Sequence, residues 1–163
     1  MAANENHKAH KPVAEFWDDL DDFETCMLVT RDGALLRSRP MAPHVRPHDG
    51  TIRFLTSDKT HKVDELEAHP EANVVFADDD DIWISVSGRI RLSRAMSDID
   101  DLWSPAADAW LENGKREAIV LILDAERGEY WEQAGALAAS WELAKAAVTG
   151  DRPGLGETGK VAL

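Results

Sequence analysis

The spacing of hydrophobic residues changes several times along the chain, and each change predicts a new element. Residues 13–23 (VAEFWDDLDDF) place apolar side chains at helical spacing with acidic residues opposite, which predicts an amphipathic helix. Residues 25–30 (TCMLVT) and 34–45 (ALLRSRPMAPHV) are β-prone runs joined by the Asp-Gly pair of RDGA, which predicts a hairpin. Pro40 cannot donate a ladder hydrogen bond, so the second strand is expected to be interrupted or to lie at a sheet edge there.

The following residues predict further strands separated by short helices. A turn signal, RPHDG, precedes a strand at 51–57, and residues 60–69 fit a helix with Thr60 as N-cap and Pro70 as its stop. Two strands are expected at 72–77 and 82–93, an irregular helical stretch at 97–113, and one long strand or two at 117–131. Good helix formers at 134–148 (AGALAASWELAKAAV) predict a closing C-terminal helix.

Consecutive hairpins interrupted by short helices are typical of an antiparallel β-barrel in the α+β class. The chain has 163 residues, of which 44% are apolar, and this fits one domain with a sizeable core. Residues 1–11 are polar and without pattern, so we expect a flexible N-terminal tail followed by a single domain over 12–163.

The overall charge excludes some classes of partner. With 31 acidic and 18 basic residues the net charge is −13, which argues against binding nucleic acid, because phosphate backbones are held by basic surfaces. No apolar run approaches a membrane span and residues 1–12 carry no signal-peptide core, so no membrane association and a cytoplasmic location are expected. Cys26 is the only cysteine, and its apolar neighbours predict a buried thiol rather than a reactive one.

One segment runs against this acidic background. Between residues 31 and 62 seven basic residues stand against three acidic ones, a local charge of +4. If residues 35–41 form a strand, Arg37 and Arg39 project from the same face, and Ser38 and Pro40 from the other. Two neighbouring guanidiniums are costly to bury without an anion, so this face either holds an anion or is simply solvated.

The junction between the strand at 51–57 and the next helix favours the anion. A phosphate at this junction can accept hydrogen bonds from the free amides of the first helical turn and from the hydroxyl of Ser57 or Thr60. His61 and Lys62 add positive charge. By contrast, GLGETGKVAL at the C-terminus matches glycine-rich phosphate-binding patterns only by chance, because too few residues follow to form the required helix.

Several segments, taken in order, resemble the pyridoxamine-5′-phosphate-oxidase-like flavoproteins, and in particular their bacterial general stress proteins. These segments are RSRPM, FLTSDKTHKVDEL with HPEANVVF, ISVSGRIRLSR, and the later LWSP and AW. The resemblance spans about residues 13–163. It implies a split β-barrel homodimer that binds FMN, with FAD as an alternative, in two clefts at the subunit interface.

The same resemblance implies which residues contact the cofactor. The implied cofactor-binding residues are Arg37, Ser38, Arg39, Pro40, Met41, Leu55, Thr56, Ser57, Thr60, His61, Lys62 and Trp131. Of these, Thr60, His61 and Lys62 correspond to the phosphate-binding segment, with His61 in place of the arginine usual in the oxidases. Trp131 is expected to approach the flavin from the partner subunit, with packing in the core or the dimer interface as the alternative. Such packing is also expected for Trp17, Trp103, Trp110 and Trp141.

Two departures from the oxidases argue against the vitamin-oxidase reaction. Trp83 stands where the oxidases carry a glutamine near the flavin, and the C-terminal arginine and histidine motif for the vitamin phosphate is missing. We therefore expect a flavin-dependent oxidoreductase with an unassigned substrate and a small-molecule redox partner, with no catalytic residue identified and no metal site. The alternatives are a related barrel that binds F420 or haem, and a non-enzymatic flavin binder or sensor.

Overall fold

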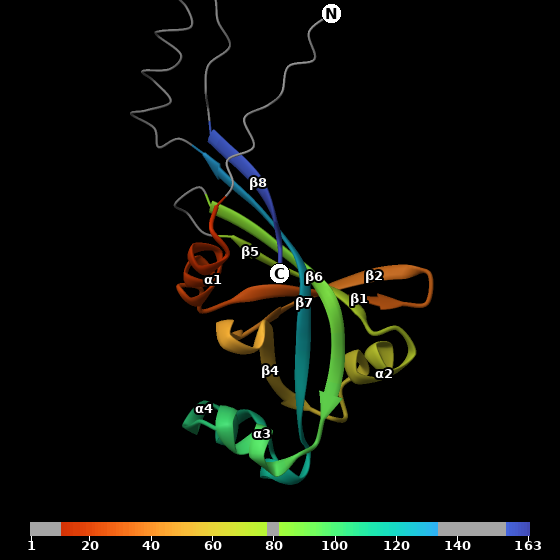
Figure 1. Ribbon diagram of the computed structural model, residues 1–163. Helices are drawn as coiled ribbons and strands as arrows, with labels where there is room; N and C mark the ends of the chain where they lie inside the picture. Colours follow the sequence, from red (N-terminus) through yellow and green to blue (C-terminus); the bar gives the residue numbers. More distant parts are fainter. Residues whose placement is uncertain (1–10, 78–81, 134–155) are drawn as a thin grey trace, which may run out of the picture.

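A computed structural model describes residues 11–77, 82–133 and 156–163. Its centre is one antiparallel sheet in the order β2-β1-β5-β6-β7-β4-β3, with β8 added to β7 (Figure 1). The strands are β1 Cys26–Asp32, β2 Leu35–Met41, β3 His44–Arg46, β4 Thr51–Ser57, β5 Glu71–Ala77, β6 Ile82–Ser93, β7 Ala118–Gln133 and β8 Gly156–Ala162. The helices are α1 Val13–Asp21, α2 His61–Ala68, α3 Met96–Leu102 and α4 Pro105–Trp110, with 3-10 turns η1 Pro47–Asp49 and η2 Gly114–Arg116.

The predicted class is confirmed: an α+β fold built on an antiparallel split barrel with short flanking helices. The end strands β2 and β3 are not paired with each other in the described part of the chain, so the sheet does not close. The predicted closing helix at 134–148 lies outside the described residues. No helix among the described residues is long and apolar enough to cross a membrane.

Strands β6 and β7 have 12 and 16 residues, and they extend through both the upper and the lower part of the fold in the view of Figure 1. The continuous apolar run at the start of β7 is buried on both faces, because its alternate residues enter two different cores. Ile119, Leu121 and Leu123 face the larger core, and Ala118, Val120 and Ile122 face a smaller core under α3. The run predicted as one strand or two is a single strand, with a register shift opposite Ser87 and Gly88.

Helix α1 forms as its sequence pattern predicts and covers the sheet near β7. Phe16, Trp17 and Leu20 are buried, whereas Val13 at the start of the helix is exposed. The Phe16 ring lies directly on Gly128 of β7, where a side chain would have no room. A glycine inside this strand therefore marks a close approach of helix to sheet.

Strands β2 and β8 each pair with one other strand, and their sequences predict them unequally well. Strand β2 continues through Pro40, opposite Met27, and it is an edge strand as predicted, so the missing N–H breaks no second ladder. Strand β8 was not predicted, because its glycine-rich sequence lacks an alternating pattern. Lys160 lies within β8 and pairs with Glu129 at 3.1 Å, an arrangement unlike a phosphate-binding loop.

Lys11, which we assigned to the flexible tail, is instead held against the sheet. Its Nζ lies 2.5 Å from Asp19 and 2.9 Å from Glu132, and 4.9 Å from the centre of the Tyr130 ring. Burial would lower the pKa of Lys11, but the hydrogen bonds and charges of the two carboxylates outweigh it and raise the pKa. Lys11 therefore packs with the domain and does not belong to the tail.

Candidate functional site

The junction between β4 and α2 adopts the predicted strand-to-helix geometry. Thr60 is the N-cap of α2, but its hydroxyl donates to the Ser57 carbonyl oxygen at 2.8 Å instead of accepting a helix amide. Among the described residues, no side chain caps the start of α2. The amides of the first turn are thus left without a side-chain acceptor, which favours an anion at this position.

Lys62 points back from α2 to the end of β4. Its Nζ donates to the Thr56 hydroxyl at 2.9 Å, so one predicted basic residue meets one predicted lining residue. Burial lowers the pKa of Lys62, repulsion by Arg39 lowers it further, and Glu65 opposes both effects. A half-buried ammonium close to another cation gains more from a bound anion than an exposed one does.

Arg37 and Arg39 do share a face of β2, as the strand alternation predicts, but a carboxylate already lies between them. The Glu65 Oε2 atom lies 2.8 Å from Arg39 Nη2, and Oε1 lies 3.2 Å from Arg37 Nη1. The Thr30 hydroxyl donates to Glu65 and accepts from Arg39, and Arg37 also lies 3.4 Å from Asp32. The anion that two neighbouring guanidiniums require is therefore supplied from within the chain.

Glu65 is the residue of this site that the sequence reasoning missed. Only 1% of its side chain is exposed. Burial alone would raise the pKa of Glu65, but hydrogen bonds from Thr30 and Arg39 and the charges of Arg39 and Arg37 outweigh burial and lower it. An acidic residue among the apolar positions of a short helix, beside a strand with two arginines, is the signal that could have revealed it.

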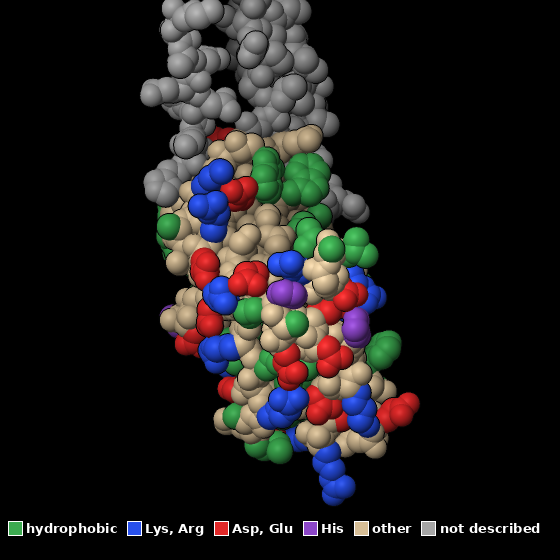
Figure 2. Space-filling view, turned by 90° about the vertical axis from the view of Figure 1, so that its right-hand side faces the viewer, with side chains coloured by type: hydrophobic (Ala, Val, Ile, Leu, Met, Phe, Trp, Pro, Cys, Tyr) green, Lys and Arg blue, Asp and Glu red, His purple; other side chains and the backbone are tan. Residues whose placement is uncertain are grey.

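His61 turns toward carboxylates rather than toward Lys62. Its Nε2 lies 3.5 Å from Asp32 and 3.8 Å from Glu65, and its Nδ1 lies 3.6 Å from Asp64. Asp32, His61 and Glu65 are close enough to share a metal ion, but Arg37 already contacts both carboxylates and would repel a cation. Figure 2 shows acidic and basic side chains interspersed over the side of the molecule that carries α2 and the β1–β2 hairpin.

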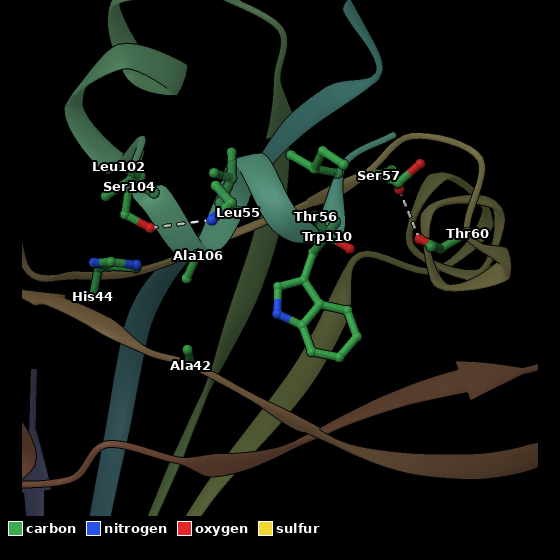
Figure 3. A pocket seen from close by; sticks show the side chains of 12 residues that line it. Ala42, His44, Leu55, Thr56, Ser57, Thr60, Leu102, Ser104, Ala106 and Trp110 are labelled. Carbon is green, nitrogen blue, oxygen red and sulfur yellow. Dashed lines mark hydrogen bonds between the residues drawn. The ribbon is translucent and has the colours of Figure 1, made fainter. Parts of the chain in front are cut away.

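A cavity of about 390 Å³ opens beside this junction. Its lining residues are Ala42, His44, Leu55, Thr56, Ser57, Thr60, Leu102, Ser104, Ala106, Ala107, Trp110 and Leu111. In Figure 3 the hydroxyls of Ser57 and Thr60 lie at one end, and His44 and Ser104 lie at the other. Four of the predicted cofactor residues, Leu55, Thr56, Ser57 and Thr60, therefore share one cavity wall.

Further lining residues come from α3, α4 and β3, which the sequence reasoning did not assign to the site. Trp110 is 84% exposed, and its ring projects from α4 into the open space (Figure 3). It therefore does not pack in the core, and the alternative expectation, packing at a dimer interface, stays a prediction. His44 also lines this cavity. Burial lowers the pKa of His44, Arg46 lowers it further, and Asp101 opposes the shift.

The remaining predicted residues of β2 are divided between its two faces. Ser38 and Pro40 are exposed, whereas Met41 is half-buried and packs against the larger core. Trp17 is buried in that core as predicted, and Trp103 packs against the smaller one. Trp141 lies outside the described residues.

Trp131 lies far along β7 from the β4–α2 junction of the same chain. It is on β7, where Ile119 pairs with Thr56, and twelve residues of strand separate Ile119 from Trp131. At a rise of about 3.3 Å per residue this is roughly 40 Å of strand, much more than a side chain can span. Trp131 is 39% exposed and lies across from Trp83 on β6.

The fold, the two arginines on one face of β2 and the β4–α2 junction all agree with one protein family. The sequence model of the family described as pyridoxamine 5'-phosphate oxidase like matches residues 11–154. The chain belongs to this family. The match covers both α2 and the cavity wall formed by α3 and α4.

Individual relatives place the chain in the general stress protein branch of the family. General stress protein 26 of Bacillus subtilis strain 168 is 30% identical over 103 residues, which are 58% of this chain and 73% of that protein. The structure of a candidate general stress protein 26 from Jannaschia sp. CCS1 is 30% identical, with a TM-score of 0.72, covering 92% of this chain and 97% of that one. A general stress FMN/FAD-binding protein from Xanthomonas citri is 29% identical, with a TM-score of 0.64 and coverages of 75% and 89%.

Proposed function

We propose that this protein binds FMN at the β4–α2 junction and acts as a flavin-dependent oxidoreductase with a small-molecule redox partner. The observation that carries the proposal is the convergence of Lys62, the Thr56 and Ser57 hydroxyls and the uncapped start of α2 beside one cavity. These donors fit a phosphate, because hydroxyls, free helix amides and an ammonium are the groups that hold phosphate in proteins. The flavin-binding relative from Xanthomonas citri supports the same cofactor.

In this proposal each group of residues has a separate task. Thr60, Lys62 and the first amides of α2 hold the phosphate, and His61 stands at the start of the same helix. Leu55, Thr56 and Ser57 form the wall against which the rest of the cofactor lies, and Arg37 to Met41 border it along β2. The bound flavin supplies hydride or electron transfer, while the protein supplies binding, orientation and electrostatics.

The proposal includes a homodimer with the cofactor at the subunit interface. Trp131 supports it, because this residue lies too far along β7 to reach the junction of its own chain. Large apolar side chains exposed on the surface, Leu35, Leu36, Met27 and Trp110, add apolar area that a second copy would cover. Size-exclusion chromatography with light scattering tests the assembly, and a monomer at micromolar concentration would refute it.

The identity of the cofactor is tested first by mass spectrometry of whatever ligand co-purifies. Finding FMN would support the proposal, and finding FAD would change only which flavin the protein binds. F420 or haem would replace the cofactor, and a flavin that no nicotinamide donor can reduce would favour a binder or sensor over an oxidoreductase. We also expect the protein to act in the cytoplasm, where these donors are found.

The site itself is tested by titrating FMN into wild-type protein, Lys62→Ala and Arg39→Ala, with riboflavin as the ligand that lacks the phosphate. Lys62→Ala is expected to weaken FMN binding by roughly 10- to 100-fold, the range of a charge-assisted hydrogen bond, and to leave riboflavin binding nearly unchanged. Lys59→Ala is the matched control. It removes the same charge three residues away, but Lys59 is exposed and pairs with Glu117 at 3.2 Å. Unchanged FMN affinity in both site variants would refute the assignment.

A further inference from the structure

Glu65 occupies an unusual position for an acidic residue in a phosphate-binding site. Its carboxylate is buried among the cations proposed to attract phosphate, and it contacts Arg37 and Arg39 directly. Its charge also partly opposes the lowering of the Lys62 pKa by burial and by Arg39. A single buried carboxylate therefore interacts with all three cations.

The charges of this cluster nearly cancel. Arg37, Arg39 and Lys62 face Glu65 and Asp32, so three positive and two negative charges leave a net charge of +1. The phosphate monoester of FMN carries a charge of about −2 near neutral pH. The cluster therefore presents less attraction to phosphate than its three cations would alone, and guanidinium N–H groups engaged with Glu65 are not free to donate to a ligand.

We propose that Glu65 sets the affinity and selectivity of the site for phosphorylated flavin by competing with the phosphate for the arginines of β2. This inference rests on the proposed function and deepens it. Arg37, with 50% of its side chain exposed, is the residue that turns from Glu65 and Asp32 to the phosphate. Arg39, with 18% exposed and a further contact to Thr30, stays with Glu65.

Because Glu65 competes with the phosphate, we expect bound FMN to exchange with free FMN. The arginines remain neutralised without a ligand, so the empty site avoids the cost of buried, uncompensated guanidiniums and does not depend on flavin for stability. When Arg37 leaves for the phosphate, Glu65 keeps Arg39 as its partner and is never left buried and unpaired.

The test compares wild-type protein, Glu65→Gln and Glu67→Gln by calorimetric titration with FMN and with riboflavin. Glu67 is exposed on the same helix, so its substitution removes the same charge from α2 without touching the arginines. Removing one negative charge a few ångströms from the site is expected to tighten FMN binding by about three- to tenfold at low salt. Riboflavin affinity and the Glu67→Gln variant are expected to match wild type.

A second variant keeps the test valid if Glu65→Gln folds poorly. Asp32→Asn frees Arg37 from its exposed carboxylate contact and is expected to tighten FMN binding in the same direction by a smaller factor. Equal or weaker FMN binding in both variants, with wild-type binding intact, overturns the role of Glu65 and leaves the proposed site standing. Failure of the wild-type protein to bind FMN overturns the proposed function instead.

Discussion

Replacing Gly128 with alanine tests the close packing of helix α1 on strand β7. A Cβ atom at this position would lie 2.3 Å from Cζ of Phe16 and less than 3 Å from both ring Cε atoms. Carbon atoms normally approach to about 3.5–4.0 Å, so the ring or the helix must move by more than 1 Å. Phe16 is fully buried in the larger core, with its ring packed edge-on against Trp17.

The expected size of the effect follows from two opposing contributions. Overpacking a well-filled core costs about 1–3 kcal/mol, whereas replacing glycine by alanine restricts the unfolded chain and returns about 0.4–1 kcal/mol. We expect Gly128→Ala to lower the free energy of unfolding by about 1–2 kcal/mol. For a chain of this length, that corresponds to a fall in Tm of roughly 3–6 °C.

Urea unfolding followed by circular dichroism measures this change, and the Phe16→Leu background isolates its cause. A smaller side chain at position 16 leaves room for the new methyl group, so the Gly128→Ala penalty should shrink by about 1 kcal/mol in the double variant. A Gly128→Ala protein as stable as wild type would refute the reasoning. An equal penalty in both backgrounds would place the strain elsewhere than at the Phe16 ring.

Three further predictions concern the buried polar groups. Burial raises the pKa of Cys26 to about 12, so its thiol should react with Ellman's reagent at pH 8 only as fast as the protein unfolds, and rapid labelling of native protein would contradict this. Thr30→Val removes the hydroxyl that joins Arg39 to Glu65 and should lower the free energy of unfolding by about 1–3 kcal/mol, measured by urea unfolding against the exposed Thr25→Val control. The lowered pKa of Glu65 stabilises the fold above its unfolded pKa near 4.5, and this stability is lost as the pH falls through the folded value. Glu65→Gln should therefore flatten the decline in unfolding free energy below pH 4.5, and an unchanged acid profile would contradict the ion-pair assignment.

Much of the fold could be predicted because its signals are local. The amphipathic pattern of α1, the Asp-Gly turn of the first hairpin and the Thr60 and Pro70 limits of α2 each depend on residues close in sequence. Strand β8 had no such signal, since its glycines and charges form a strand only by pairing with the free edge of β7. The double burial at the start of β7 likewise depends on two cores that the chain assembles from distant segments.

In the candidate site, too, the features that depend on local spacing could be predicted and those that depend on distant contacts could not. Spacing alone put Arg37 and Arg39 on one face and placed Lys62 at a helix start, and both features are present in the structure. Spacing could not show that Glu65 lies between the arginines, because that contact joins residues 26 and 28 positions apart. It also gave no indication that α4 brings Trp110 to the lining of the cavity.

By itself, the sequence of this protein determined most of the secondary structure, with β8 as the exception, the edge position of strand β2 with its Pro40, and the basic residues available to an anion. Each of these depends on short-range pattern and residue chemistry. Only the tertiary structure decided how strongly those cations are already neutralised, which residues line the cavity, and that Trp131 lies roughly 40 Å of strand away from the junction. The reason is physical: the strength of a charge depends on its burial and its neighbours, and those neighbours come from strands and helices that only folding brings together.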